Sequence, residues 1–117
     1  SKGGHEALIE AQRWPDDFDG IVAMAPAIHL QSLFLGFTRN NKLVFAPGGN
    51  LTPAKLATLN QAVLAACDAQ DGATDGIVSQ PKLCTFDPAS LRCTGADSNA
   101  CLTDPQVTTA SSLYGTW

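Results

Sequence analysis

A serine followed closely by two glycines opens the chain, in the segment Ser1-Lys2-Gly3-Gly4. A nucleophilic serine at a sharp strand-to-helix turn needs small neighbours, and these glycines would supply them. The backbone N–H of Lys2 would then point at the oxyanion that develops when the serine attacks a carbonyl, and the helix N-terminus would add a favourable dipole. The same four residues also fit a simpler interpretation, in which Ser1 only caps a helix after a glycine-rich turn.

Other interpretations of Ser1 differ in the base that would activate it. A serine at a true N-terminus can be an N-terminal nucleophile that uses its own α-amine as the base. His5 lies four residues after Ser1, but an elbow serine faces away from the helix body, so we expect His5 on the helix surface. His29 comes just after the expected strand, near the edge where α/β sheets place their sites. We expect a loop role for His29.

A second group of chemically suited residues is the acidic segment after Cys67. Asp68, Asp71 and Asp75 lie three and four residues apart, and Gly72 and Gly76 follow two of them. Calcium prefers about six to eight oxygen ligands from carboxylates, carbonyls and water, and glycines allow a loop to turn its carbonyls inward. The spacing lacks the alternating acidic ladder of an EF-hand. An ordinary Asp-Gly surface turn is the alternative.

The four cysteines all lie between Cys67 and Cys101. No Cys-x-x-Cys pair exists and neither histidine is nearby, so disulfides in an oxidising compartment are favoured over a metal cage. Four cysteines allow three connectivities, of which the most local is Cys67–Cys84 with Cys93–Cys101. The first of these bridges would close both ends of the acidic segment and contribute roughly 3 kcal/mol in the chain-entropy model.

The elements that would hold Ser1 follow it directly. Residues 2–12 are mostly good helix formers, and Pro15 marks the loop after them. The run Ile21–Ala25 is short and apolar with turn residues on both sides, as in a strand buried on both faces of a parallel sheet. Helix, loop and buried strand form the second half of a βαβ unit, which predicts an α/β fold.

Three more helices are expected after this strand. Thr52 is a good N-cap with Pro53 at the first helical position, and Thr103 or Asp104 caps the last helix. The expected helices cover residues 30–37, 53–67 and 104–114. The segment 68–99 is rich in Asp, Gly, Ser, Thr and Cys, and we expect it to be irregular.

Composition excludes several functional classes. The chain has 117 residues, of which 44% are hydrophobic and 15% charged, and its net charge is −4. The few scattered basic residues argue against a nucleic-acid surface. No segment approaches the roughly 20 apolar residues of a membrane span, and the apolar content is too high for a disordered chain. The start at Ser1, without Met or a signal segment, predicts a processed or truncated chain.

Three stretches of the sequence, in order, resemble the tannase and feruloyl esterase family. The first is SKGGHEA at residues 1–7 with EAQR at 10–13, and the second is PDDFDGIVA at 15–23 with APA at 25–27. The third runs from AACD at 65–68 through the Asp-Gly pairs at 71–72 and 75–76 to CTFDPASLRC at 84–93 and CLTDPQV at 101–107. The resemblance covers nearly the whole chain and is weakest over residues 28–50.

The resemblance implies an α/β-hydrolase core with an inserted lid, secreted or periplasmic. Residues 1–27 would be part of the core, and residues 28–117 the N-terminal part of the lid. Ser1 would be the nucleophile and the Lys2 N–H an oxyanion donor. The resemblance also supports the two local disulfides, and it implies a structural Ca²⁺ held by the following residues: Asp68, Asp71 and Asp75 through their carboxylates, and Ala73 and Ile77 through their carbonyls.

The implied activity is hydrolysis of phenolic-acid esters through an acyl-enzyme, with a small aromatic ester as the substrate and neither nucleic acid nor membrane as a partner. The family places its acid and base downstream of residue 117 and its other oxyanion donor upstream of Ser1, so we expect this chain alone to be inactive. Met24 stands where the family usually has glycine. The alternatives are a non-catalytic, disulfide-rich calcium-binding module and an N-terminal nucleophile hydrolase that uses Ser1.

Overall fold

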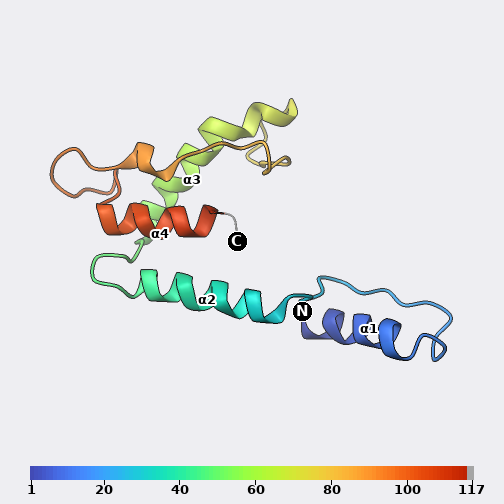
Figure 1. Cartoon of the computed structure of the whole chain (residues 1–117). Coiled ribbons are helices and arrows are strands. Elements are labelled where there is room, and N and C mark those ends of the chain that lie inside the picture. Colours follow the sequence, from blue (N-terminus) through green and yellow to red (C-terminus); the bar gives the residue numbers. More distant parts are fainter. Residues whose placement is uncertain (116–117) are drawn as a thin grey trace. The chain divides into compact units, whose positions relative to one another are not determined.

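The computed structural model describes residues 1–115, which are helical wherever they are regular (Figure 1). The α-helices are α1 (Lys2–Arg13), α2 (Leu30–Val44), α3 (Pro53–Cys67) and α4 (Asp104–Tyr114), with 3₁₀ turns η1 (Asp68–Asp71) and η2 (Pro88–Leu91). The chain divides into two compact units, one over Ser1–Thr38 and one from Arg39 onward. This boundary falls inside α2. No helix within the described residues is long and apolar enough to cross a bilayer.

The predicted strand at Ile21–Ala25 is wrong for this chain. Those residues carry no strand assignment, and the isolated bridge between Arg92 and Leu102 is the β-pairing found within residues 1–115. A strand forms only when a neighbour satisfies its backbone groups, and the described residues offer none to this segment. Its apolar side chains are correspondingly uncovered, with Val22 86% and Met24 76% exposed.

The helix starts at Thr52 and Thr103 agree with the local sequence signals, whereas the predicted end of the helix that begins at residue 30 is wrong. Thr52 caps α3 as expected, with its side chain accepting from the Lys55 N–H at 3.4 Å, and Thr103 is the N-cap of α4. The helix expected at residues 30–37 instead continues to Val44. No proline interrupts the chain between Phe37 and Pro47, so the helix propagates beyond its last large aromatic residue.

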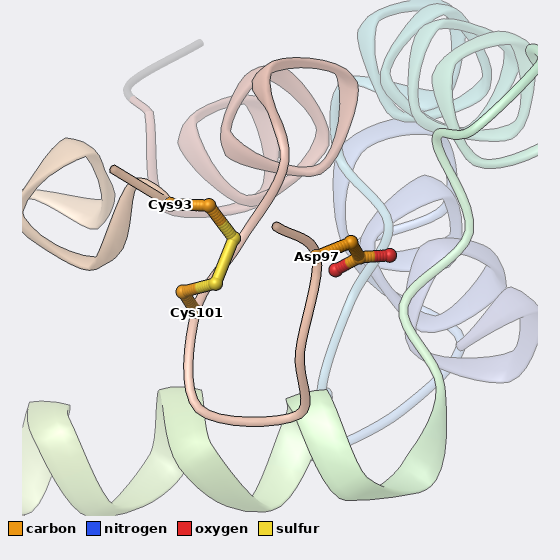
Figure 2. Close-up of side chains that lie close together, drawn as sticks. All are labelled: Cys93, Asp97 and Cys101. Carbon is orange, nitrogen blue, oxygen red and sulfur yellow. A yellow bond between two sulfur atoms is a disulfide. The ribbon is translucent and has the colours of Figure 1, made fainter. Parts of the chain in front are cut away.

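The second unit has a small core, reinforced by two disulfides. Leu59, Leu102, Val107 and Ala110 form the buried cluster, against which η2 and its neighbours pack. The bridges are Cys67–Cys84 and Cys93–Cys101, the most local of the three possible pairings. Figure 2 shows the second bridge closing a short loop, with Asp97 beside it. Each bridge restricts an irregular segment that has few apolar residues of its own.

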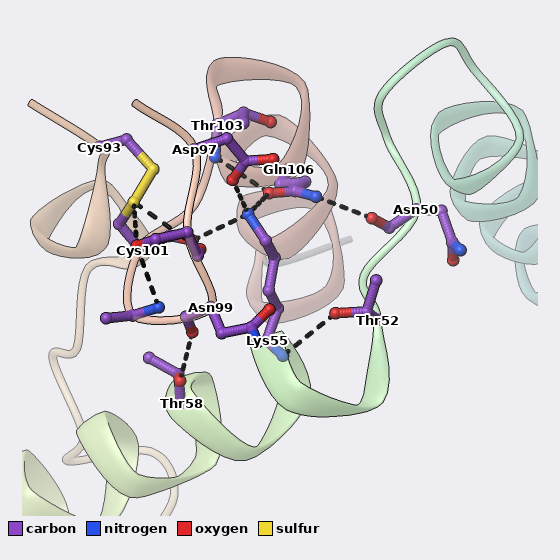
Figure 3. Close-up of polar contacts among 12 residues, drawn as sticks. Asn50, Thr52, Lys55, Thr58, Cys93, Asp97, Asn99, Cys101, Thr103 and Gln106 are labelled. Carbon is purple, nitrogen blue, oxygen red and sulfur yellow. Dashed lines mark hydrogen bonds and ion pairs between the residues drawn. A yellow bond between two sulfur atoms is a disulfide. The ribbon is translucent and has the colours of Figure 1, made fainter. Parts of the chain in front are cut away.

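A buried lysine joins α3 to this disulfide loop and to α4 (Figure 3). Lys55 is 4% exposed, and its Nζ donates to the Asp97 carboxylate, to the Cys101 carbonyl (3.0 Å) and to Gln106 Oε1 (2.7 Å). Gln106 Oε1 also accepts from the Thr103 N–H at 3.0 Å, while its Nε2 donates to the Asn50 carbonyl at 3.0 Å. All three protons of the ammonium group therefore have acceptors, as a buried charge requires.

We expect Lys55→Met to destabilise the protein by about 1–3 kcal/mol, because it leaves the Cys101 carbonyl without its partner and removes the tie between α3 and α4. Lys82→Met is the matched control. Lys82 lies exposed on the surface, so its replacement should change stability by less than about 0.5 kcal/mol. Thermal unfolding of both variants measures the difference. Equal melting temperatures for the two would show that the Lys55 network contributes nothing.

Candidate active site

Ser1 lies at the N-terminus of α1, where its hydroxyl is both a helix cap and an exposed group. Its Oγ accepts from the Gly4 N–H at 3.0 Å, and the hydroxyl donates to the Met24 carbonyl at 3.3 Å. Lys2 is the first residue of α1, so its backbone N–H is one of the first-turn donors that have no acceptor within the helix. The structure thus places the two predicted groups next to each other at the positive end of a helix dipole.

Gly4 allows the chain to approach this helix end closely. It is the buried residue of α1. A Cβ at this position would lie 2.8 Å from Pro26 Cα and 2.9 Å from Pro26 N, and closer still to the Met24 carbonyl oxygen. Such contacts with backbone atoms cannot be relieved by rotating a side chain. Gly3, by contrast, faces open space, so only the second glycine is required by packing.

Residues 24–27 are hydrogen-bonded to the start of α1. The Ser1 amine donates to the Ala25 carbonyl, and the Ala27 N–H donates to the Ser1 carbonyl at 3.3 Å. Ala25 has φ +45°, the one positive φ outside glycine in the described part of the chain. This left-handed conformation costs an alanine of order 1 kcal/mol or more. The contacts with Ser1 hold the backbone in this conformation.

The same residues border an open hollow of about 620 Å³ within the first unit. Most of its wall is apolar, and the polar side chains come from three positions: Ser1, His29 and Ser32. Mostly apolar walls with a few polar groups are typical of sites that bind small organic molecules. Ser1 is therefore accessible from a surface on which an apolar substrate can rest.

The two histidines have different environments. His5 is half-buried rather than exposed on the helix surface as expected, and its Nδ1 lies 2.9 Å from the Ala27 carbonyl oxygen. This contact, and not one to Ser1, orients the His5 ring. His29 is an exposed loop residue directly before α2, as expected, and it lies in the wall of the hollow.

The acidic segment folds back so that its carboxylates bind its own backbone. The buried Asp68 accepts from the Gly76 N–H with both oxygens at 3.1 Å. Asp71 accepts from Ala73 N–H at 2.9 Å and Ser79 N–H at 3.2 Å, and Asp75 accepts from Ile77 N–H at 3.0 Å. Gly72 and Gly76 have positive φ of 93° and 80°, which allows these sharp turns.

The hydrogen bond from Ala73, together with those from Ser79, holds the pKa of Asp71 below its usual range. The folded state therefore favours the ionised carboxylate, and the resulting stability is present above the pKa of the unfolded chain. It is lost as the pH falls through the lower folded pKa. At neutral pH this carboxylate is therefore charged.

A different cluster brings three side chains of metal-binding type close together. Among residues 1–115, Cys93, Asp97 and Cys101 have ligand atoms within 4.8 Å of one another. The two sulfurs are joined to each other (Figure 2) and Asp97 is paired with Lys55, so this cluster has no free thiolate and its carboxylate is already neutralised. The three aspartates of the acidic segment do not form such a group by side chains alone.

The buried network around Lys55 was missed at the sequence level, although one signal was available. Lys55 lies four residues before Leu59, so helical periodicity places it on the buried face of α3. A lysine on that face needs acceptors from elsewhere in the fold.

Comparison with known proteins identifies the family. A family model described as "Tannase and feruloyl esterase" matches residues 1–117. An esterase of Xanthomonas campestris pv. campestris is 43% identical over 114 residues, which cover 97% of this chain and 20% of that protein. A mono(2-hydroxyethyl) terephthalate hydrolase of Piscinibacter sakaiensis is 37% identical over 131 residues, covering 92% of this chain and 22% of that protein.

A solved structure agrees. The crystal structure of feruloyl esterase B from Aspergillus oryzae superimposes with a TM-score of 0.83 at 33% identity, over 94% of this chain and 23% of that one. The chain thus spans about a fifth of the length of its relatives. Since the match to the family model extends over the whole sequence, the chain belongs to the tannase and feruloyl esterase family.

Proposed function

We propose that the protein containing this chain is a serine carboxylic ester hydrolase that acts on esters of phenolic acids, with Ser1 as its nucleophile. The observation that carries the proposal is the position of Ser1, exposed in the hollow at the N-terminus of α1 and beside the Lys2 N–H. The names of the relatives, which include a feruloyl esterase and a terephthalate ester hydrolase, support ester hydrolysis as the reaction class.

In the proposed reaction, Ser1 Oγ attacks the ester carbonyl carbon while its proton passes to a base. The tetrahedral oxyanion accepts a hydrogen bond from the Lys2 N–H and is favoured by the helix dipole. Collapse of the tetrahedral species expels the alcohol, protonated by the same base, and leaves an acyl-enzyme that water hydrolyses. The resemblance places that base and its acid partner downstream of Trp117, so we expect this chain alone to be inactive.

The N-terminal nucleophile alternative is less well supported. It requires the α-amine of Ser1 as a free base near its own hydroxyl. In the structure this amine donates to the Ala25 carbonyl. The nitrogen is thus engaged with the backbone of residue 25 and not with the Ser1 hydroxyl.

A covalent probe tests the assignment directly. A fluorophosphonate reacts with activated serine nucleophiles and leaves ordinary hydroxyls unmodified. We expect peptide mapping of the labelled full-length protein to find the phosphonyl group on Ser1 and none on Ser32, which borders the same hollow. Labelling elsewhere, with Ser1 unmodified in a protein that hydrolyses esters, would assign the nucleophile to another residue.

We further propose that the acidic segment holds a structural Ca²⁺. Its donors are oxygens only: Asp68, Asp71 and Asp75, with the carbonyls of Ala73 and Ile77. Each carboxylate has about four acceptor positions and uses one or two of them for backbone N–H groups. The remaining positions are available to a cation. Asp68 is buried and has no cationic partner among the described residues. Such a carboxylate is stabilised by a nearby cation.

Removing calcium should therefore destabilise the full-length protein. At a calcium concentration 100 times Kd, binding contributes about 2.7 kcal/mol to the folded state. We expect EGTA to lower the melting temperature, and Asp71→Ala to lower it similarly while abolishing the response to EGTA. Asp16→Ala, an exposed site outside the segment, should melt and respond like wild type. Metal analysis should first establish that the treated protein is free of calcium. If its melting curve is then the same as before treatment, the proposed calcium site is refuted.

The two disulfides support an oxidising location, so we propose that the protein is secreted or periplasmic. We also propose that residues 1–27 belong to the core and residues 28–117 to the lid. The two compact units of this chain divide after Thr38, which lies further along the chain than this proposed boundary.

A further inference from the structure

The hollow beside Ser1 contains a second group able to recognise a substrate. His29 is exposed in its wall, and its imidazole has no hydrogen-bond partner among the described residues. The other histidine, His5, is held by the Ala27 carbonyl at 2.9 Å. The chain thus has one histidine whose ring is engaged in holding the backbone and one whose ring is free for a ligand.

The backbone of His29 is fixed although its ring is free. Its carbonyl accepts from the Leu33 N–H at 3.0 Å, which is the first hydrogen bond of the turn that begins α2. Its neighbours Ala27 and Ile28 line the same hollow, and Ala27 is hydrogen-bonded to Ser1. The backbone at His29 therefore has a defined position near Ser1, and the ring can rotate about its side-chain torsions to meet a ligand.

The chemistry of the wall indicates what His29 would bind. Around Ser1 the lining is mostly alanine, proline, isoleucine and leucine, which suits the face of an aromatic ring. An aromatic ring alone needs no polar partner, whereas a ring hydroxyl buried against such a wall needs one. Imidazole can both donate and accept a hydrogen bond. Ser32, the remaining polar side chain of the wall, lies three residues further along on α2.

We propose that His29 binds the ring hydroxyl of the phenolic acyl group and thereby positions the ester carbonyl at Ser1. This inference rests on the proposed function. It assigns to His29 a contact with the substrate and no role in moving the serine proton.

Two esters that differ by one hydroxyl test this role in the full-length protein. The substrates are methyl 4-hydroxycinnamate and methyl cinnamate, and the variants are His29→Phe and His29→Gln. Phe keeps a planar ring but cannot hydrogen-bond, whereas Gln keeps a donor and an acceptor. We expect His29→Phe to lower kcat/KM for the hydroxylated ester about five- to tenfold, mainly through KM, and to leave the cinnamate unchanged. His29→Gln should restore most of the loss.

Each other outcome has a definite meaning. A loss in kcat of several orders of magnitude on both esters would make His29 the general base and overturn the proposal. Equal small losses on both esters would show only a packing role, and this also overturns it. If wild-type protein hydrolyses neither ester, the proposed function itself fails. Selective loss with the hydroxylated ester establishes the proposal, provided that circular dichroism and melting of His29→Phe match wild type.

Discussion

Ser1→Ala in the full-length protein should lower kcat for a phenolic-acid ester by about four to six orders of magnitude and leave substrate binding nearly unchanged. Removing the nucleophile of an acyl-transfer site eliminates the covalent route, while the oxyanion donors and binding contacts sustain only a weak residual rate. Steady-state kinetics, with a direct binding measurement on the inactive variant, gives both quantities.

The matched control separates catalysis from helix capping. Ser1 also accepts from the Gly4 N–H, and loss of such a cap costs about 1 kcal/mol. Ser1→Asn retains a good capping side chain but has no nucleophilic oxygen. We therefore expect Ser1→Asn to melt near wild type and to be as inactive as Ser1→Ala. An active Ser1→Asn variant would leave Ser1 with its capping role alone.

Helix starts could be predicted because their signals are local. Thr52 with Pro53, and Thr103 before Asp104, define helix starts within a few residues. The strand at residues 21–25 could not be judged in this way, because a strand depends on partners that are distant in sequence. Its apolar composition is typical of a buried strand, but the residues described here do not provide the neighbours that would bury it.

In the candidate site, too, local features could be predicted from the sequence and long-range contacts could not. The two glycines after Ser1 were expected to be the small neighbours of a sharp turn, and the structure shows that Gly4, but not Gly3, is closely approached by other backbone atoms. The hollow requires residues 25–33 to lie beside Ser1, which no spacing rule predicts. Likewise, Lys55 reaches Asp97, Cys101 and Gln106 across 42 to 51 residues of sequence, so its partners become apparent only in the folded chain.

Gly4→Ala should be the most damaging small substitution near the site. Alanine normally stabilises a helix by about 1 kcal/mol relative to glycine, but here the new methyl group would press on Pro26 and on the Met24 carbonyl. Forcing an atom into a well-packed site typically costs about 1–3 kcal/mol, and more where backbone must move. Since Met24 and Ala25 also contact Ser1, the shift should displace the nucleophile and lower kcat as well as stability.

Gly3→Ala is the control that makes this prediction decisive. The two glycines are adjacent in the first turn of α1, and a Cβ at Gly3 meets no atom within 4 Å. The helix-propensity gain is common to both substitutions, so their difference in melting temperature isolates the contact with residues 24–26. We expect Gly3→Ala to equal or exceed wild type in stability, with unchanged kcat, and Gly4→Ala to fall below it in both. If Gly4→Ala were as stable and active as Gly3→Ala, the close approach of residues 24–26 to α1 would not be what positions Ser1.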